Sequence, residues 1–175
     1  MEETTISTKK YIVNYGLVLG LIWIAYGLIR YTTDNVTTRN LGLSIIELSI
    51  QISIIVYGIY SYKSTNNGYL KLGQAIKIGT GIVLIGAFLA IIWNILLKTL
   101  IEPDMMNEIL ASEREVLINQ NPNMPQEQID ENMAMAGKLS SLYVTSALVL
   151  VSDTLLGFVI SLFAGAIMQK KRNEY

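Results

Sequence analysis

The sequence has 175 residues, of which 51% are apolar and 15% are charged, and its formal net charge is −1. This balance gives no indication of a nucleic-acid partner or of an acidic substrate. The chain contains neither Cys nor His, which excludes thiol nucleophiles, disulfides, the usual zinc sites and imidazole acid–base catalysis. We therefore expect no cofactor and no metal site, and an enzyme is the least favoured class of function.

The first apolar run covers about residues 11–31 and follows a polar start that ends in Lys9 and Lys10. A signal peptide has a shorter apolar core and a small-residue cleavage site, so this run is predicted to be a membrane helix. Gly16 and Gly20 lie on one face of that helix and allow close approach of another helix. The same spacing also arises by chance in Gly-rich apolar runs.

The second apolar run covers about residues 41–62 and contains Glu47. It follows a short polar loop that includes Asp34 and Arg39. Alternating Ile and Ser over residues 49–54 would suit a strand, but a span of this length favours a membrane helix. Residues 61–68 have the composition of a turn.

The third run, about residues 75–98, is the stretch around which the chain is organised. No charge occurs between Ile78 and Leu97. At about 1.5 Å per residue this uncharged part is about 30 Å long, which matches the hydrocarbon thickness of a bilayer. Lys77 and Lys98 flank it, and it is predicted to be the third membrane helix.

Residues 102–138 are rich in acidic side chains and separate the third run from the fourth. Apolar residues at helical spacing, a break at residues 121–125 and a second helical pattern predict a helical hairpin outside the membrane. A disordered acidic linker is the alternative. The methionines of this segment either form a contact surface for a partner or pack its own two helices together (Met105, Met106, Met124, Met133 and Met135).

The fourth run covers about residues 139–169, contains Asp153 and ends in basic residues. Gly157, Ser161 and Gly165 place a small residue at every fourth position, which is the strongest helix-packing pattern in the chain. We expect this face to require small side chains, so that alanine is tolerated there better than leucine.

Together the four runs predict an all-α, four-helix integral membrane bundle in which residues 1–175 form a single membrane domain. Eight of the 13 basic side chains lie at the N-terminus, around the second connection or at the C-terminus. Because basic residues concentrate on the cytoplasmic side, both termini are predicted to be cytoplasmic and residues 102–138 to lie outside. The eight are Lys9, Lys10, Lys63, Lys71, Lys77, Lys170, Lys171 and Arg172, and the others are Arg30, Arg39, Lys98, Arg114 and Lys138.

Four polar residues are predicted to share one depth in the membrane. Counting about 1.5 Å per residue from the cytoplasmic lysines puts Glu47, Asn94 and Asp153 in one layer, with the long side chain of Arg30 within reach. Such a layer is either a cation or proton site, or a structural cluster in which Arg30 and Asn94 hold a carboxylate. The structural interpretation is favoured because a charge near the interface is only modestly costly.

Several short motifs resemble those of a known family. They are Asn67-Gly68-Tyr69, Gly73-Gln74-Ala75, Ile101-Glu102-Pro103 and the apolar segment 157–167 before a basic tail. With them, nearly the whole chain resembles the membrane proteins of Bacteroidetes-type bacteria catalogued as domain of unknown function 4199. The resemblance implies four inner-membrane helices with a long loop between the third and fourth, but no established activity. Members are sometimes encoded near a glycosyltransferase that acts on lipid-linked sugars, which is a hint about partners.

We therefore expect a non-enzymatic accessory or scaffold subunit that lies in the lipid bilayer. It is expected to pack, through the face from Gly157 to Gly165 or through the acidic hairpin, with itself or with another membrane protein. The alternative is a small transporter or ion-conducting protein that uses Glu47 and Asp153. Against it, no apolar run contains Pro, and no matched pair of broken helices marks a substrate site.

Overall fold

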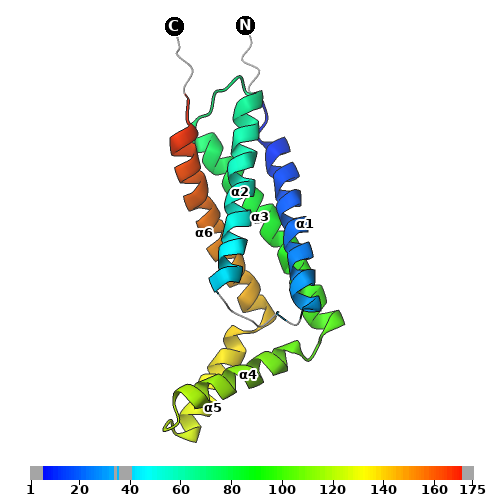
Figure 1. Ribbon diagram of the computed structural model, residues 1–175, viewed down its shortest axis with the longest axis vertical. Helices are drawn as coiled ribbons and strands as arrows, with labels where there is room; N and C mark the ends of the chain where they lie inside the picture. Colours follow the sequence, from blue (N-terminus) through cyan, green and yellow to red (C-terminus); the bar gives the residue numbers. More distant parts are fainter. Residues whose placement is uncertain (1–5, 34, 36–40, 171–175) are drawn as a thin grey trace. The chain divides into compact units, whose positions relative to one another are not determined.

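The computed structural model describes residues 6–33, 35 and 41–170, and within these ranges it contains α-helices, a short π-helical segment and no β-strand. Four helices are long and apolar enough to cross a membrane, as the sequence predicts (Figure 1). They are α1 (Lys9–Thr32), α2 (Leu41–Thr65), α3 (Leu72–Leu96) and α6 (Leu142–Met168). Their ends lie within about one helical turn of the predicted ones. The loop residues Asp34 and Arg39, and the tail residues Lys171 and Arg172, lie outside the described residues.

The third membrane helix continues beyond its predicted end through a π-helical segment, Leu97–Ile101. The carbonyl oxygen of Leu97 accepts the backbone N–H of Glu102 at 2.8 Å, which is the wider ring of a π-turn. Pro103 follows, and it has no N–H to donate and restricts the residue before it. The helix therefore widens and stops at this point.

The chain divides into two compact units. The first unit contains α1, α2, the part of α3 up to Ala90, and α6 from Leu150 onward. The second unit runs from Ile91 to Val149 and contains the two helices α4 (Met105–Gln120) and α5 (Gln126–Leu139). The single membrane domain expected over residues 1–175 stays a prediction.

In the first unit, α3 is the helix against which the others pack. Its Ile78 and Ile82 are fully buried, as are Ile55 and Ile59 of α2, and all belong to one apolar cluster. Gly58 of α2 faces Ile82, and a Cβ atom added there would lie 2.6 Å from the Ile82 Cδ1 atom. The long uncharged run therefore predicted the central element correctly.

One end of the first unit brings together the start of α1, the end of α2, the start of α3 and the end of α6. The Tyr62 hydroxyl donates to the carbonyl oxygen of Ile6 at 3.3 Å, and its ring makes a T-shaped contact with Tyr11 at 5.4 Å. Leu70 and Lys170 exchange two backbone hydrogen bonds of 3.1 and 3.0 Å. The first and last described segments are thus tied to the connection between α2 and α3.

The connection between α2 and α3 is shorter than the predicted turn, because α2 continues to Thr65. The reversal occurs at Asn67 and Gly68, which have φ angles of 56° and 79°. Asn and Gly are the residues that adopt this left-handed conformation most readily. The Gln74 side-chain oxygen then accepts the Lys71 N–H at 2.9 Å, which is half of a capping box at the start of α3.

In the second unit, α4 and α5 pack against each other. The segment between α3 and α6 thus contains two helices and is not the unstructured linker considered as the alternative. Arg114 of α4 and Asp130 of α5 form an ion pair at 2.7 Å, with side chains 41% and 56% exposed. Leu110 lies in ordinary contact range of Gly137. Of the methionines, Met105 is buried, Met135 is exposed and the others are intermediate.

Candidate functional site

Arg30 and Glu47 form an ion pair that joins the C-terminal turn of α1 to α2. Arg30 Nη1 lies 3.2 Å from Glu47 Oε1, and the two side chains are 22% and 36% exposed. The Nε and Nη2 groups of the same guanidinium donate to the carbonyl oxygen of Asn35, at 3.1 and 2.8 Å. Because the guanidinium is a rigid fork of donors, these bonds fix its orientation. Arg30 therefore holds both α2 and the chain that follows α1.

Tyr26 belongs to the same cluster, although the sequence patterns do not single it out. The centre of its ring is 5.9 Å from the guanidinium carbon of Arg30, which is a cation–π distance. The ring also makes a T-shaped contact with Trp23 at 6.0 Å. The Tyr26 hydroxyl is buried and lies near the Glu47 carboxylate, whereas the buried Thr80 hydroxyl on α3 has no hydrogen-bond partner in the described part of the chain. The spacing of four residues between Tyr26 and Arg30 is the signal that could have identified it.

Asp153 lies on α6 in the same unit and is half-buried. Glu47 is close enough for the two negative charges to act on each other. The ion pairs formed by the described residues are Arg30–Glu47 and Arg114–Asp130, and no hydrogen bond to the Asp153 carboxylate occurs in that part of the chain. Asp153 thus differs from Glu47, whose charge is neutralised by Arg30.

Three of the four residues of the predicted polar layer, Arg30, Glu47 and Asp153, lie in the first unit. Arg30 and Glu47 are in contact, and Asp153 is within electrostatic range of Glu47. Asn94 belongs to the second unit, where it is exposed on α3. Among the described residues of the first unit, Glu47 is therefore neutralised by Arg30, and Asp153 has no partner.

The small-residue face of α6 is occupied by α3 of the same chain. A Cβ atom added at Gly157 would lie 2.5 Å from Val83 Cγ2, and one added at Gly165 would lie 2.7 Å from Ala75 Cβ. Between them Ser161 is fully buried, and its hydroxyl donates to the Gly157 carbonyl oxygen at 2.7 Å. A partner molecule therefore needs a different surface from this one.

The glycines of α1 also face α3. A Cβ atom at Gly16 would lie 2.6 Å from Ile85 Cβ, and one at Gly20 would meet the side chain of Leu89. In return, Gly86 of α3 faces Leu19 of α1, so that each helix offers glycine to a large side chain of the other. Gly79, Gly81 and Gly86 of α3 thus serve close packing and do not mark breaks in the helix.

The chemistry that this arrangement supports is limited to charge pairing, hydrogen bonding and proton or cation binding at Asp153. No group of three or more His, Cys, Asp or Glu side chains that could hold a metal ion occurs among the residues that the structure describes. A lone carboxylate in a membrane helix needs a proton, a cation or a hydrogen-bond donor. Any of these would compensate the negative charge or the unmet hydrogen-bonding capacity of the Asp153 carboxylate.

The fold and this site define an all-helical protein with four helices able to cross a membrane and an ionic cluster among them. The chain belongs to the family described as "Protein of unknown function (DUF4199)", whose model matches residues 14–170. The resemblance seen in the sequence is thereby confirmed. No match was found among curated proteins or among solved structures.

Proposed function

We propose that the protein is a non-enzymatic accessory or scaffold subunit of the bacterial inner membrane, which packs with itself or with another membrane protein. The observation that supports this best is Asp153, a carboxylate that has no partner among the described residues and lies on a helix long enough to span the membrane. Charged groups in such helices are rare and are usually paired or functional. We infer that a neighbouring helix from outside the chain supplies the donor. On the family resemblance alone, a membrane glycosyltransferase acting on lipid-linked sugars is a candidate partner.

The open side of α6 is the surface on which this helix would lie. Leu156, three residues beyond Asp153 and on its side of the helix, is 37% exposed, whereas the more exposed Val151 and Leu155 (59% and 61%) lie about 160° around the helix axis from Asp153. Apolar exposure is ordinary for a helix in lipid, because lipid tails are as apolar as these side chains. An interhelical hydrogen bond to Asp153 would therefore provide the specificity that the apolar surface lacks.

For the orientation, we propose that both termini are cytoplasmic and that α4 and α5 form a hairpin outside the membrane. The first unit supports this because the start of α1 and the end of α6 share one end with Lys63, Lys71 and Lys77. Basic residues of this kind mark the cytoplasmic side. The acidic composition of residues 102–138 suits the opposite side.

A second candidate function, transport of protons or cations, is favoured by the proximity of Glu47 and Asp153. A carboxylate near a second negative charge attracts a proton or a cation more strongly than an isolated carboxylate does. The ion pair between Arg30 and Glu47 counts against this function, since it leaves only one of the carboxylates free to exchange. We therefore rank transport second.

The experiment that tests the scaffold proposal is affinity purification from native membranes in mild detergent. The parent protein is compared with Asp153→Asn, which keeps a hydrogen-bonding side chain, and Asp153→Leu, which removes it. Each interhelical contact in a membrane contributes about 0.6–2 kcal/mol, so Asp153→Leu should weaken recovery of the partner or second copy about 3- to 30-fold. Asp153→Asn and the control Leu155→Ala, at an exposed position of α6 on the side away from Asp153, should behave like the parent. Equal recovery with all four proteins would contradict the proposal.

A further inference from the structure

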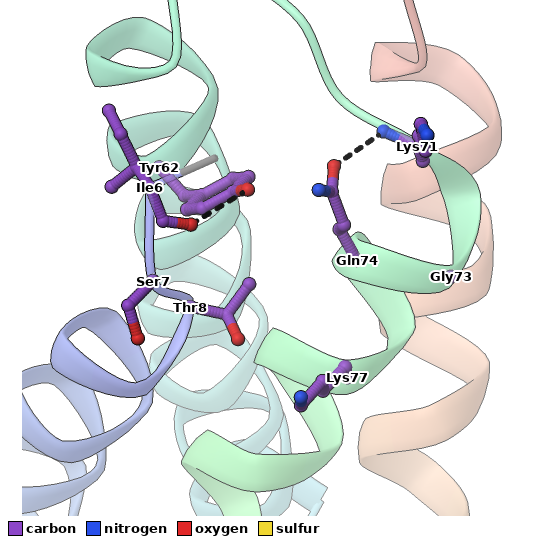
Figure 2. Close-up of a pocket in the computed structure, with 8 residues that line it drawn as sticks. All are labelled: Ile6, Ser7, Thr8, Tyr62, Lys71, Gly73, Gln74 and Lys77. Atoms are coloured by element: carbon purple, nitrogen blue, oxygen red, sulfur yellow. Dashed lines mark hydrogen bonds between the residues drawn. The ribbon is translucent and has the colours of Figure 1, made fainter. Parts of the chain in front are cut away.

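A pocket that contains two lysines lies at the end of the first unit where α1 and α3 begin. Its volume is about 610 Å³, and its lining comes from the residues before α1, the end of α2 and the start of α3 (Figure 2). This volume lies in the range of small-molecule sites. The lining residues are Ile6, Ser7, Thr8, Tyr62, Lys71, Gly73, Gln74 and Lys77.

The pocket carries positive charge that no acidic side chain of the described residues neutralises. Lys71, Gln74 and Lys77 follow one another at a spacing of three, which puts them on one face of the first turns of α3. The described ion pairs are Arg30–Glu47 and Arg114–Asp130, so neither lysine takes part in one. Residues 6–13, 60–80 and 163–170, which form this end, contain no Asp or Glu.

The neutral groups of the lining also present hydrogen-bond donors. The Gln74 side-chain oxygen is held by the Lys71 N–H at 2.9 Å, which turns the amide nitrogen the other way, towards Tyr62 (Figure 2). The Thr8 hydroxyl faces the pocket from the α1 side and Lys77 from the α3 side (Figure 2). Tyr62 is fully buried and bonded to the Ile6 carbonyl, so this wall of the pocket is fixed.

We propose that this pocket binds a phosphate group, with the ammonium groups of Lys71 and Lys77 neutralising it and the Gln74 amide and Thr8 hydroxyl donating to its oxygens. Lysine and hydroxyl donors without a competing carboxylate match a tetrahedral anion. The positive ends of α1 and α3 both adjoin the pocket and add to the same potential. The volume exceeds that of a phosphate alone and leaves room for the group that carries it.

Two sources of the phosphate fit this chemistry, an anionic lipid headgroup and a soluble phosphate. Lys77 immediately precedes the uncharged run that begins at Ile78, so the pocket lies beside the edge of the hydrocarbon, where headgroup phosphates are found. Basic pockets between membrane helices on the cytoplasmic side bind lipid headgroups in this way. The lipid is therefore the source that the position favours.

The test uses the full-length protein, purified in a neutral detergent and stripped of lipid. Binding of a short-chain phosphatidylglycerol, a short-chain phosphatidylcholine and inorganic phosphate is measured by native mass spectrometry and by the shift in thermal unfolding. The double variant Lys71→Gln/Lys77→Gln should bind phosphatidylglycerol at least about tenfold more weakly, because it loses two charge-assisted contacts. The double variant Lys63→Gln/Lys170→Gln removes the same charge from the same end but from outside the pocket, and should stay within about twofold of the parent.

A steric variant makes the test independent of charge. Gly73 lines the pocket, and a Cβ atom there would have no neighbour within 4 Å, so Gly73→Leu adds apolar bulk to the pocket lining without a clash at Cβ. This variant should fold like the parent and lose phosphatidylglycerol. Inorganic phosphate that binds the parent and competes with phosphatidylglycerol would identify the phosphate group itself as sufficient, whereas binding of phosphatidylglycerol alone would identify a lipid site. The proposal is overturned if the parent binds neither anion, if Gly73→Leu binds like the parent, or if both lysine double variants lose binding equally.

Discussion

Replacing Gly165 by alanine should separate α6 from α3, and the structure gives the size of the effect. The added Cβ atom would lie 2.7 Å from Ala75 Cβ, where carbon atoms prefer about 3.5–4.0 Å. Ala75 has no rotatable side chain with which to yield, so the backbones must move apart by about 1 Å. A gap of this size removes a quarter to a half of the dispersion energy of each contact around it.

We expect Gly165→Ala to lower the free energy of unfolding by about 1–3 kcal/mol, which is the usual cost of overpacking. Gly165→Leu should cost more. The spacing of small residues alone predicts that alanine is tolerated at this position better than leucine. The structure predicts that even alanine is destabilising, because the Cβ atom of Ala75 on α3 lies directly opposite Gly165. The matched control is Gly137→Ala on α5, where the new Cβ atom would meet Leu110 Cδ1 at an ordinary 3.9 Å.

The assay is unfolding of the purified protein in mixed micelles with increasing denaturing detergent, followed by tryptophan fluorescence. Gly137→Ala should be as stable as the parent, or more stable by up to about 1 kcal/mol through its better helix propensity. If Gly165→Ala unfolded at the same detergent concentration as Gly137→Ala, the close contact between α6 and α3 would be refuted.

Three further predictions follow from the ion pairs and the charge distribution. A reporter fused to the C-terminus should be cytoplasmic and one inserted at Asn121 should be outside, whereas swapped reporters would reverse the proposed orientation. A double-mutant cycle of Arg30→Leu and Glu47→Gln in the same unfolding assay should give a coupling energy of about 0.6–2 kcal/mol, and a value near zero would contradict a structural ion pair. The equivalent cycle for Arg114 and Asp130 should give less than about 1 kcal/mol because both side chains are exposed, and a larger value would indicate that this pair is shielded from water.

The helices able to cross a membrane could be predicted because their signal is local. An uncharged run such as Ile78–Leu97 fixes both the type and the length of a helix without knowledge of its neighbours. The π-helical end at Leu97–Ile101 could not be predicted in the same way, since it depends on how the last carbonyl groups find donors before Pro103. Small residues at every fourth position indicated that α6 packs closely, but not which helix it packs against.

The sequence predicted the depth of the polar residues in the membrane, but not which of them contact one another. Counting residues placed Glu47 and Asp153 at a similar level, because the rise per residue in a helix is constant. The pairing of Arg30 with Glu47, and the lack of a partner for Asp153 among the described residues, depend on the rotation of each helix about its axis. The sequence patterns did not indicate Tyr26, because a tyrosine in an apolar run is common. Its role is the contact of its ring with the guanidinium of Arg30, which lies one helical turn later.

The measurement that tests the scaffold function most directly is proton and cation flux through the purified protein in liposomes. The parent and Asp153→Asn are compared, with Glu47→Gln as a control that neutralises the carboxylate already paired with Arg30. A scaffold predicts no flux above that of empty liposomes with any of the three proteins. A flux through the parent that a correctly folded Asp153→Asn protein loses would contradict the scaffold function and establish transport, because a neutral amide cannot exchange a proton.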